Sequence, residues 1–179
     1  MTVLAAMLVA SVSTICWGQA LPSASESQVK AAFLYRFLGF VEWPAQAFER
    51  TDSPLVIGVL GADALAEELE AVVAGRVVHG HPVEARKIRR GDSFAGLHVL
   101  FVGQAAGPAI SSLMGASKAG ALLAVTETEE ALAQGSMINF VVVDNKVRFD
   151  VAPGLAEQRS LKISSRLLAV ARRVLASPS

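Results

Sequence analysis

The sequence LVIGVLGAD, residues 55–63, decides the fold class. Its first six residues form a short apolar run rich in valine and isoleucine, which predicts a strand buried on both faces. Gly61 then marks a turn, and Asp63 is expected to cap a helix over residues 64–74 that ends at Gly75. A buried strand, a glycine turn and a helix form the repeating unit of an α/β sheet.

The same unit recurs further along the chain. The runs LHVLFV (residues 97–102) and ALLAV (121–125) predict two more buried strands, with a small-residue helix between them over residues 108–117. Residues 83–88 predict another strand, and residues 127–134 predict a short acidic helix. Because continuous apolar strands need cover on both faces, we expect a mostly parallel sheet with helices on each side.

An antiparallel hairpin is expected over residues 139–151. Its strands are joined by Asp144 and Asn145, which tolerate the positive φ of a tight turn. In its second strand, apolar and charged side chains alternate. The strand is therefore expected to expose one face to solvent or to lie at the edge of the sheet. Residues 160–175 have the pattern of an amphipathic helix. The sequence therefore predicts one α/β domain over residues 28–176, with a mixed, mostly parallel sheet and an added hairpin in the C-terminal half.

The N-terminal part divides into three segments. Residues 1–20 carry no charge and end in Gly18-Gln19-Ala20, which predicts a secretory signal cleaved near Ala20 and a periplasmic mature chain. An uncleaved N-terminal anchor is the alternative. Residues 21–27 form a polar lead-in, and residues 29–42 an apolar helix capped by Ser25 or Ser27. Pro44 disfavours the helical backbone conformation at the preceding residue, so this helix is expected to end before Trp43.

Composition excludes several functional classes. The 179 residues are 53% hydrophobic and 18% charged, which excludes a disordered chain. Sixteen basic residues balance sixteen acidic ones, so no net field draws the protein to nucleic acid or an anionic membrane. The single cysteine, Cys16, lies in the leader, which excludes thiol catalysis, an internal disulfide and a multi-thiolate metal site in the mature chain.

No motif points to catalysis or to a cofactor. The glycine-containing turn at residues 58–63 lacks dinucleotide and phosphate-loop spacing, and the chain contains no G-x-S-x-G. His79 and His81 lack the further ligands that a zinc site needs, and His98 is expected to be a core residue. We therefore expect no catalytic residue, metal or cofactor, although distant groups that converge in a cleft would reopen the question of an enzyme.

Aromatic and basic residues supply the candidate contact surfaces. Six aromatic residues gather within residues 33–48, and the chain after residue 157 carries five basic residues and no acidic one. Phe33, Phe37 and Phe40 are assigned to the core. Arg36, Trp43 and Pro44 are predicted to form an exposed contact. Uneven charge of this kind suits self-association or a charged protein partner, and equally an ordinary solvated surface.

Four segments, in this order, resemble the YfiR-like family of exported bacterial proteins. They are residues 29–44 (VKAAFL through FVEWP), 137–140 (MINF), 146–150 (KVRFD) and 161–168 (LKISSRLL). The resemblance implies a small periplasmic α/β protein, usually a homodimer, without enzymatic activity. It also implies binding to the periplasmic sensor region of an inner-membrane diguanylate cyclase, which is held inactive, so that cyclic di-GMP and biofilm formation fall. An outer-membrane, peptidoglycan-binding lipoprotein would sequester such a repressor.

The resemblance extends the set of predicted partner-binding residues. To Arg36, Trp43 and Pro44 it adds Arg148 on the wet face of the hairpin and Arg166 on the last helix. The best-known members carry cysteines in the mature domain and this chain has none, which puts redox control in doubt here. A periplasmic module that binds a small molecule at the carboxyl ends of its strands is the alternative function.

Overall fold

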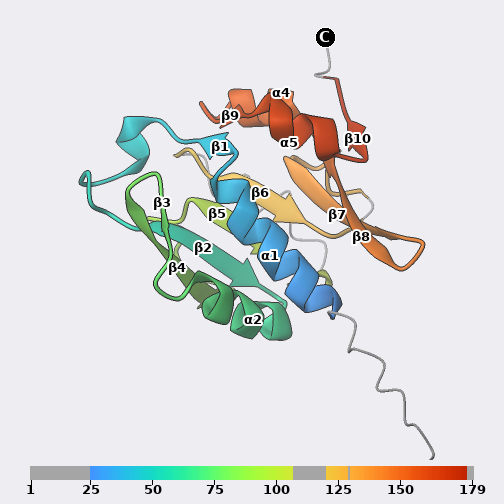
Figure 1. The fold of residues 1–179 in the computed structure, drawn as a ribbon, viewed down its shortest axis with the longest axis horizontal. Helices are drawn as coiled ribbons and strands as arrows, with labels where there is room; N and C mark the ends of the chain where they lie inside the picture. Colours follow the sequence, from blue (N-terminus) through green and yellow to red (C-terminus); the bar gives the residue numbers. More distant parts are fainter. Residues whose placement is uncertain (1–24, 107–119, 129, 177–179) are drawn as a thin grey trace, which may run out of the picture.

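The described chain is built around an eight-stranded sheet with the strand order β10-β8-β7-β6-β5-β2-β4-β3 (Figure 1). This computed structural model describes residues 25–106, 120–128 and 130–176. Strands β2, β4, β5, β6 and β7 run parallel, whereas β3 and β8 are antiparallel to their neighbours β4 and β7. The strands are β2 (Leu55–Leu60), β3 (Val77–Val78), β4 (His81–Ile88), β5 (Val99–Val102), β6 (Leu123–Thr126), β7 (Ile138–Val143), β8 (Lys146–Val151) and β10 (Arg173–Val174). The predicted mixed, mostly parallel α/β sheet is confirmed.

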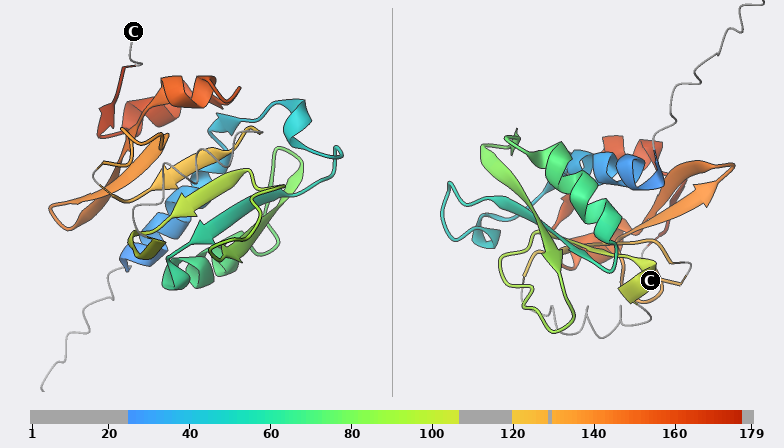
Figure 2. Two further views of the ribbon diagram at one scale, coloured as in Figure 1. Left: turned by 180° about the vertical axis from the view of Figure 1, so that it is seen from behind. Right: turned by 90° about the horizontal axis from the view of Figure 1, so that it is seen from below.

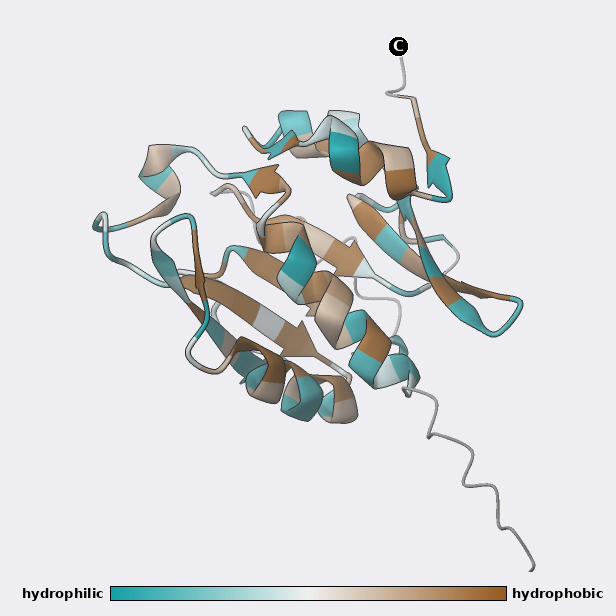
Figure 3. Cartoon of the chain, viewed as in Figure 1, coloured by the Kyte–Doolittle hydropathy of each residue, from teal (hydrophilic) through white to brown (hydrophobic). Residues whose placement is uncertain are grey.

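Two helices lie on one face of this sheet, as the edge-on view in Figure 2 shows. They are α1 (Glu26–Leu38) and α2 (Asp63–Val73), which pack against each other. In the described chain the opposite face is covered by η2 (Gln104–Ala106) and by the loop around Phe94 and Leu97. The helix expected over residues 108–117 lies outside the described residues. Every residue of β2 is buried, because β2 is covered on both faces, and Figure 3 shows the strand as mostly hydrophobic.

Aromatic rings join α1 to the hairpin. Phe37 is fully buried and lies with its ring centroid 5.1 Å from that of Phe149 and 5.7 Å from that of Phe140. Phe33 and Phe40 are only partly buried at the margin of this cluster. Burying a phenylalanine contributes about 1.5–3 kcal/mol, so the cluster fixes α1 to this end of the sheet.

The first helix is shorter than its apolar pattern predicts. Ser25 is its N-cap, in a capping box with Gln28, as one of the two expected caps. The helix ends at Leu38, four residues before the predicted end, and Gly39 is its C-cap in a right-handed conformation with a φ of −80°. Val41 and Glu42 then form the strand β1, which pairs antiparallel with β9 (Lys162–Ile163) in a separate two-stranded sheet. A strand partner that is distant in sequence has overridden the local helical pattern.

The prediction of one amphipathic helix over residues 160–175 is wrong. This segment forms β9, then α5 (Ser165–Val170) and then β10, and a further helix, α4 (Pro153–Glu157), precedes it. Ser164 is the N-cap of α5 and accepts a hydrogen bond from the backbone N–H of Arg166 (3.2 Å). The helix ends early because Arg172 and Arg173 both bind the carboxylate of Asp150 and so draw the chain along β8. Asp150 is one of the charged side chains of the second hairpin strand that were expected to face solvent. Its carboxylate is instead buried.

Three smaller expectations have different outcomes. The hairpin turn is confirmed, with φ values of 49° at Asp144 and 55° at Asn145. Helix α2 is confirmed, but its N-cap is Ala62, and Asp63 is its first residue. The prediction of an acidic helix over residues 127–134 is also wrong. The described residues of this stretch form turns, and Ala131 is buried among them.

Candidate functional site

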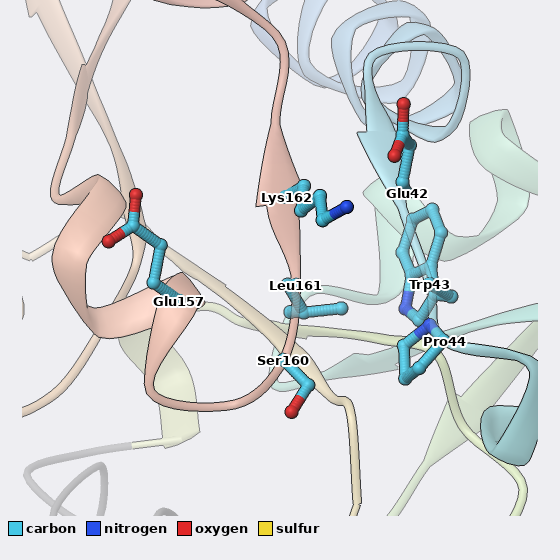
Figure 4. Close-up of a pocket in the computed structure, with 7 residues that line it drawn as sticks. All are labelled: Glu42, Trp43, Pro44, Glu157, Ser160, Leu161 and Lys162. Carbon is cyan, nitrogen blue, oxygen red and sulfur yellow. The ribbon is translucent and has the colours of Figure 1, made fainter.

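A pocket of about 470 Å³ lies where β1 meets β9 (Figure 4). Trp43 and Pro44 form one wall, and Leu161 and Ser160 face them from the other side. The pocket exists because the register pairs Val41 with Ile163 and so brings the segments that follow β1 and precede β9 face to face. The complete lining is Glu42, Trp43, Pro44, Glu157, Ser160, Leu161 and Lys162. Its size is that of a site for a small molecule or for one anchoring side chain of a protein partner.

The indole of Trp43 is held in a fixed position. Its Nε1–H donates to the backbone carbonyl oxygen of His98 (3.3 Å), and its ring meets the imidazole of His98 edge to face. A wall that is ordered before binding loses little conformational entropy when a partner docks. The sequence prediction that Trp43 and Pro44 share one contact is therefore consistent with their positions.

The three predicted arginines are exposed but do not line this pocket. Arg36 lies in the last turn of α1, Arg148 on β8 and Arg166 in the first turn of α5. The backbone N–H of Ser164 donates to the carbonyl oxygen of Phe40 (2.8 Å), which places the start of α5 beside the end of α1. Arg148 lies elsewhere, opposite Val141 in the hairpin. The structure thus distributes the five predicted residues over a pocket and its surroundings and does not unite them in one site.

A second surface was missed in the sequence. Val170 at the end of α5, Val174 in β10 and Leu175 directly after it are exposed by 68%, 47% and 36%. The amphipathic pattern over residues 160–175 places Leu175 in one stripe with Leu161, Leu168 and Ala171, whereas the helix ends at Val170. The aliphatic residues on both sides of Arg172 and Arg173 could have indicated this surface from the sequence. Exposed aliphatic residues near cationic side chains are typical of protein-binding surfaces.

The carboxyl ends of β2, β5 and β6 form a third candidate. A cavity of about 380 Å³ lies there, and the ammonium of the buried Lys30 binds the carboxylates of Glu26 and Glu127. Burial disfavours the charged ammonium, but its bonds to Glu127 and Glu26 outweigh this effect and raise the pKa of Lys30. Glu127 also accepts from the backbone N–H of Gln104 (2.9 Å). The ion pairs tie α1 to the loops after β5 and β6, so Lys30 has a structural role here.

Two of the three histidines, His81 and His98, are engaged in local contacts. The Nδ1 atom of His81 lies 2.7 Å from the carbonyl oxygen of Ser53, and Nδ1 of His98 accepts from the backbone N–H of Val56 (3.2 Å). Within residues 25–106, 120–128 and 130–176, no three His, Cys, Asp or Glu side chains gather as metal ligands would. In the same residues, no helix has the length and hydrophobicity that crossing a bilayer requires.

The comparisons with known proteins agree with the motif series. A model of YfiR/HmsC-like proteins matches residues 27–172. The chain belongs to the YfiR/HmsC-like family. This is a periplasmic, regulatory family, known for control of diguanylate cyclases, and the resemblance seen in the sequence is confirmed.

A solved structure shows the same fold. It is a conserved domain protein from Vibrio cholerae, 14% identical, with a TM-score of 0.59 over 84% of this chain. The present chain covers 60% of the Vibrio chain, and at this identity the likeness concerns the fold alone. A search of curated proteins finds no match.

Proposed function

We propose that this YfiR/HmsC-like protein is a periplasmic, non-enzymatic repressor of a membrane diguanylate cyclase. It binds the periplasmic sensor region of the cyclase and holds the enzyme inactive, which lowers cyclic di-GMP and biofilm formation. The family match over residues 27–172 carries this proposal. Export with cleavage near Ala20, a homodimeric state and sequestration by an outer-membrane, peptidoglycan-binding lipoprotein belong to the same proposal.

Binding alone suffices for such a repressor. A ligand shifts the equilibrium between two states of its partner only by its difference in affinity for them, and no catalytic group is needed. The repressor therefore requires an accessible surface on a rigid scaffold. The exposed aliphatic side chains of Val170, Val174 and Leu175 supply one, because apolar groups gain free energy when a partner covers them.

Substitutions at the end of α5 and at the two edges of the sheet test this docking surface. Val174→Glu and Val170→Glu place a charge where the cyclase sensor would bury an aliphatic group, and each is expected to weaken binding about tenfold or more. Val77→Glu is the matched control, because Val77 is 60% exposed on β3 at the opposite edge. The measurement is the dissociation constant for the purified periplasmic region of the cyclase. Equal affinity of all three variants would reject this surface, and no binding of the wild type would reject the function.

The pocket beside Trp43 supports a second candidate, the binding of a small molecule. Its volume of about 470 Å³ and its lining of Trp43, Pro44 and Leu161 are suited to a compact, partly apolar ligand. A ligand that binds only the folded state raises the melting temperature. A screen of periplasmic metabolites should then find a compound that stabilises the wild type and does not stabilise Trp43→Ala. Stabilisation of both proteins by the same amount would exclude this pocket.

A further inference from the structure

Two histidines hold the segment between β1 and β2, residues 43–54, against the sheet. The ring of Phe48 stacks on His81 at a centroid distance of 3.9 Å and on His98 at 4.7 Å. Trp43 donates to the carbonyl oxygen of His98, and His81 is bonded to the carbonyl oxygen of Ser53. The contacts of this segment with the amino-terminal edge of the parallel strands thus centre on His98 and His81.

The hydrogen bonds of His98 fix its protonation state. Its Nδ1 accepts from the backbone N–H of Val56, so the proton of the neutral ring is on Nε2. Nε2 is buried, and among the described residues it has no acceptor in good hydrogen-bonding geometry, although the backbone of Ala47 lies near the ring. A second proton could enter only at Nδ1, where it would face the N–H of Val56 as donor against donor. The site is built for the neutral imidazole.

None of the ion pairs within the described residues includes His98. His81 of β4 lies beyond Phe48. Glu49 and Arg86 line the same cavity of about 260 Å³, and the guanidinium of Arg86 is bound to the carboxylate of Glu84 (2.9 Å). The carboxylate of Glu84 is thus engaged by Arg86, and no ion pair within the described residues joins Glu49 to His98. Burial lowers the pKa of His98, the backbone of Ala47 opposes this effect, and the nearby His81 adds to it.

We propose that the His98–Phe48–His81 stack is an acid-sensitive latch, in which protonation of His98 releases residues 43–54 from the sheet and opens the Trp43 pocket. The proton breaks the bond from Val56 to Nδ1, and the imidazolium leaves its buried position for water. Phe48 and Trp43 lose their ring contacts as a result. This goes beyond the proposed repressor function and does not depend on it.

The direction of the pH dependence follows from the two states. In the released segment the pKa of His98 returns towards its ordinary value of 6.5, whereas burial lowers it in the closed state. The released state therefore binds the additional proton more readily. Closure is favoured above about pH 6.5 and is progressively lost as the pH falls through the interval down to the lowered pKa.

Trp43 reports on the latch directly. The chain has two tryptophans, and the proposed cleavage near Ala20 removes Trp17, so Trp43 is the sole tryptophan of the mature protein. Acidification from about pH 7.5 to about pH 5 is expected to shift its emission to the red and to increase its quenching by acrylamide, before the far-ultraviolet circular dichroism changes. His98→Asn should abolish the transition, because asparagine keeps an acceptor for Val56 and does not titrate. His79→Asn, at an exposed position in the β3–β4 turn, should behave as the wild type.

The same experiment can overturn the latch. A transition that is unchanged in His98→Asn, that is absent from the wild type or that coincides with global unfolding would contradict it. Hydrogen exchange of the wild-type chain gives a second measurement should His98→Asn not fold. After correction for intrinsic rates, acid should increase exchange in residues 43–54 and leave α2 protected; equal changes in both segments would reject the latch. Neither measurement requires the cyclase.

Discussion

Ser160 adopts a left-handed backbone conformation, with a φ of 59°, at the rim of the pocket. The turn after α4 requires this conformation, because the backbone N–H of Leu161 returns to the carbonyl oxygen of Ala156 (3.0 Å). Glycine adopts such a φ without the steric cost that a Cβ carries. We predict that Ser160→Gly raises the free energy of unfolding by about 0.5–1 kcal/mol, measured by urea titration.

The control for this change is Ser165→Gly. Ser165 lies in the first turn of α5, where the backbone is helical and glycine brings no conformational gain. This variant should therefore be less stable than the wild type. A stabilisation by both substitutions, or by neither, would show that the conformation of residue 160 is not the cause.

Asp150 is the residue that holds the C-terminal segment. Its buried carboxylate accepts from Nε of Arg172 (2.7 Å) and from Arg173 (2.7 Å). Burial opposes its ionisation, but the bonds from Arg172 and Arg173 outweigh this effect and hold the pKa of Asp150 below its ordinary value of 3.8. Its stabilising effect is thus complete above about pH 4 and is lost as the pH falls from there through the lowered pKa.

Removing this charge tests the assignment. We predict that Asp150→Asn lowers the free energy of unfolding at neutral pH by about 1–3 kcal/mol, because a buried acceptor loses charge-assisted hydrogen bonds. Asp52→Asn is the comparison, since Asp52 pairs with Arg50 on the open surface. Denaturant titrations of both variants give the measurement. Losses of equal size would mean that the burial of Asp150 is irrelevant to its effect.

At the scale of elements, the loops after β2 and β5 pack backbone to backbone. A Cβ on Gly103 would lie 2.5 Å from the carbonyl oxygen of Gly61, whereas a Cβ on Gly39 would meet only an ordinary contact at 3.5 Å. We predict that Gly103→Ala destabilises the fold by about 1–3 kcal/mol. Gly39→Ala is expected to leave stability unchanged or to raise it slightly. The melting temperatures of the two variants decide this, and equal values would contradict the close approach.

Elements were predictable where a local pattern and the tertiary structure agree. The apolar run of β2 and the Asp144–Asn145 turn have one stable solution each, and both were anticipated. The C-terminal end of α1 and the course of residues 160–175 were not anticipated. They depend on β9 and β10, whose partner strands are distant in the sequence. Trp43 and Pro44 were predicted as a contact from aromatic composition, and both line a pocket, whereas the exposure of Val170 follows from the early end of α5, which was not predicted.

At the scale of the whole molecule, the central strands and the exposed features have separate roles. The strands β2, β5 and β6 are entirely buried and make the scaffold rigid. The pocket beside Trp43 and the aliphatic residues after Val170 lie at the margins of that scaffold. A repressor that acts by contact needs this separation, because its surface must keep its shape while a partner binds.

The level of cyclic di-GMP in cells tests the central claim most directly. In a strain that carries the cognate membrane cyclase, deletion of the gene is expected to raise cyclic di-GMP. The wild-type gene and Val77→Glu should restore the low level, whereas Val174→Glu should not. An unchanged level of cyclic di-GMP after the deletion, with the cyclase present, would contradict the account.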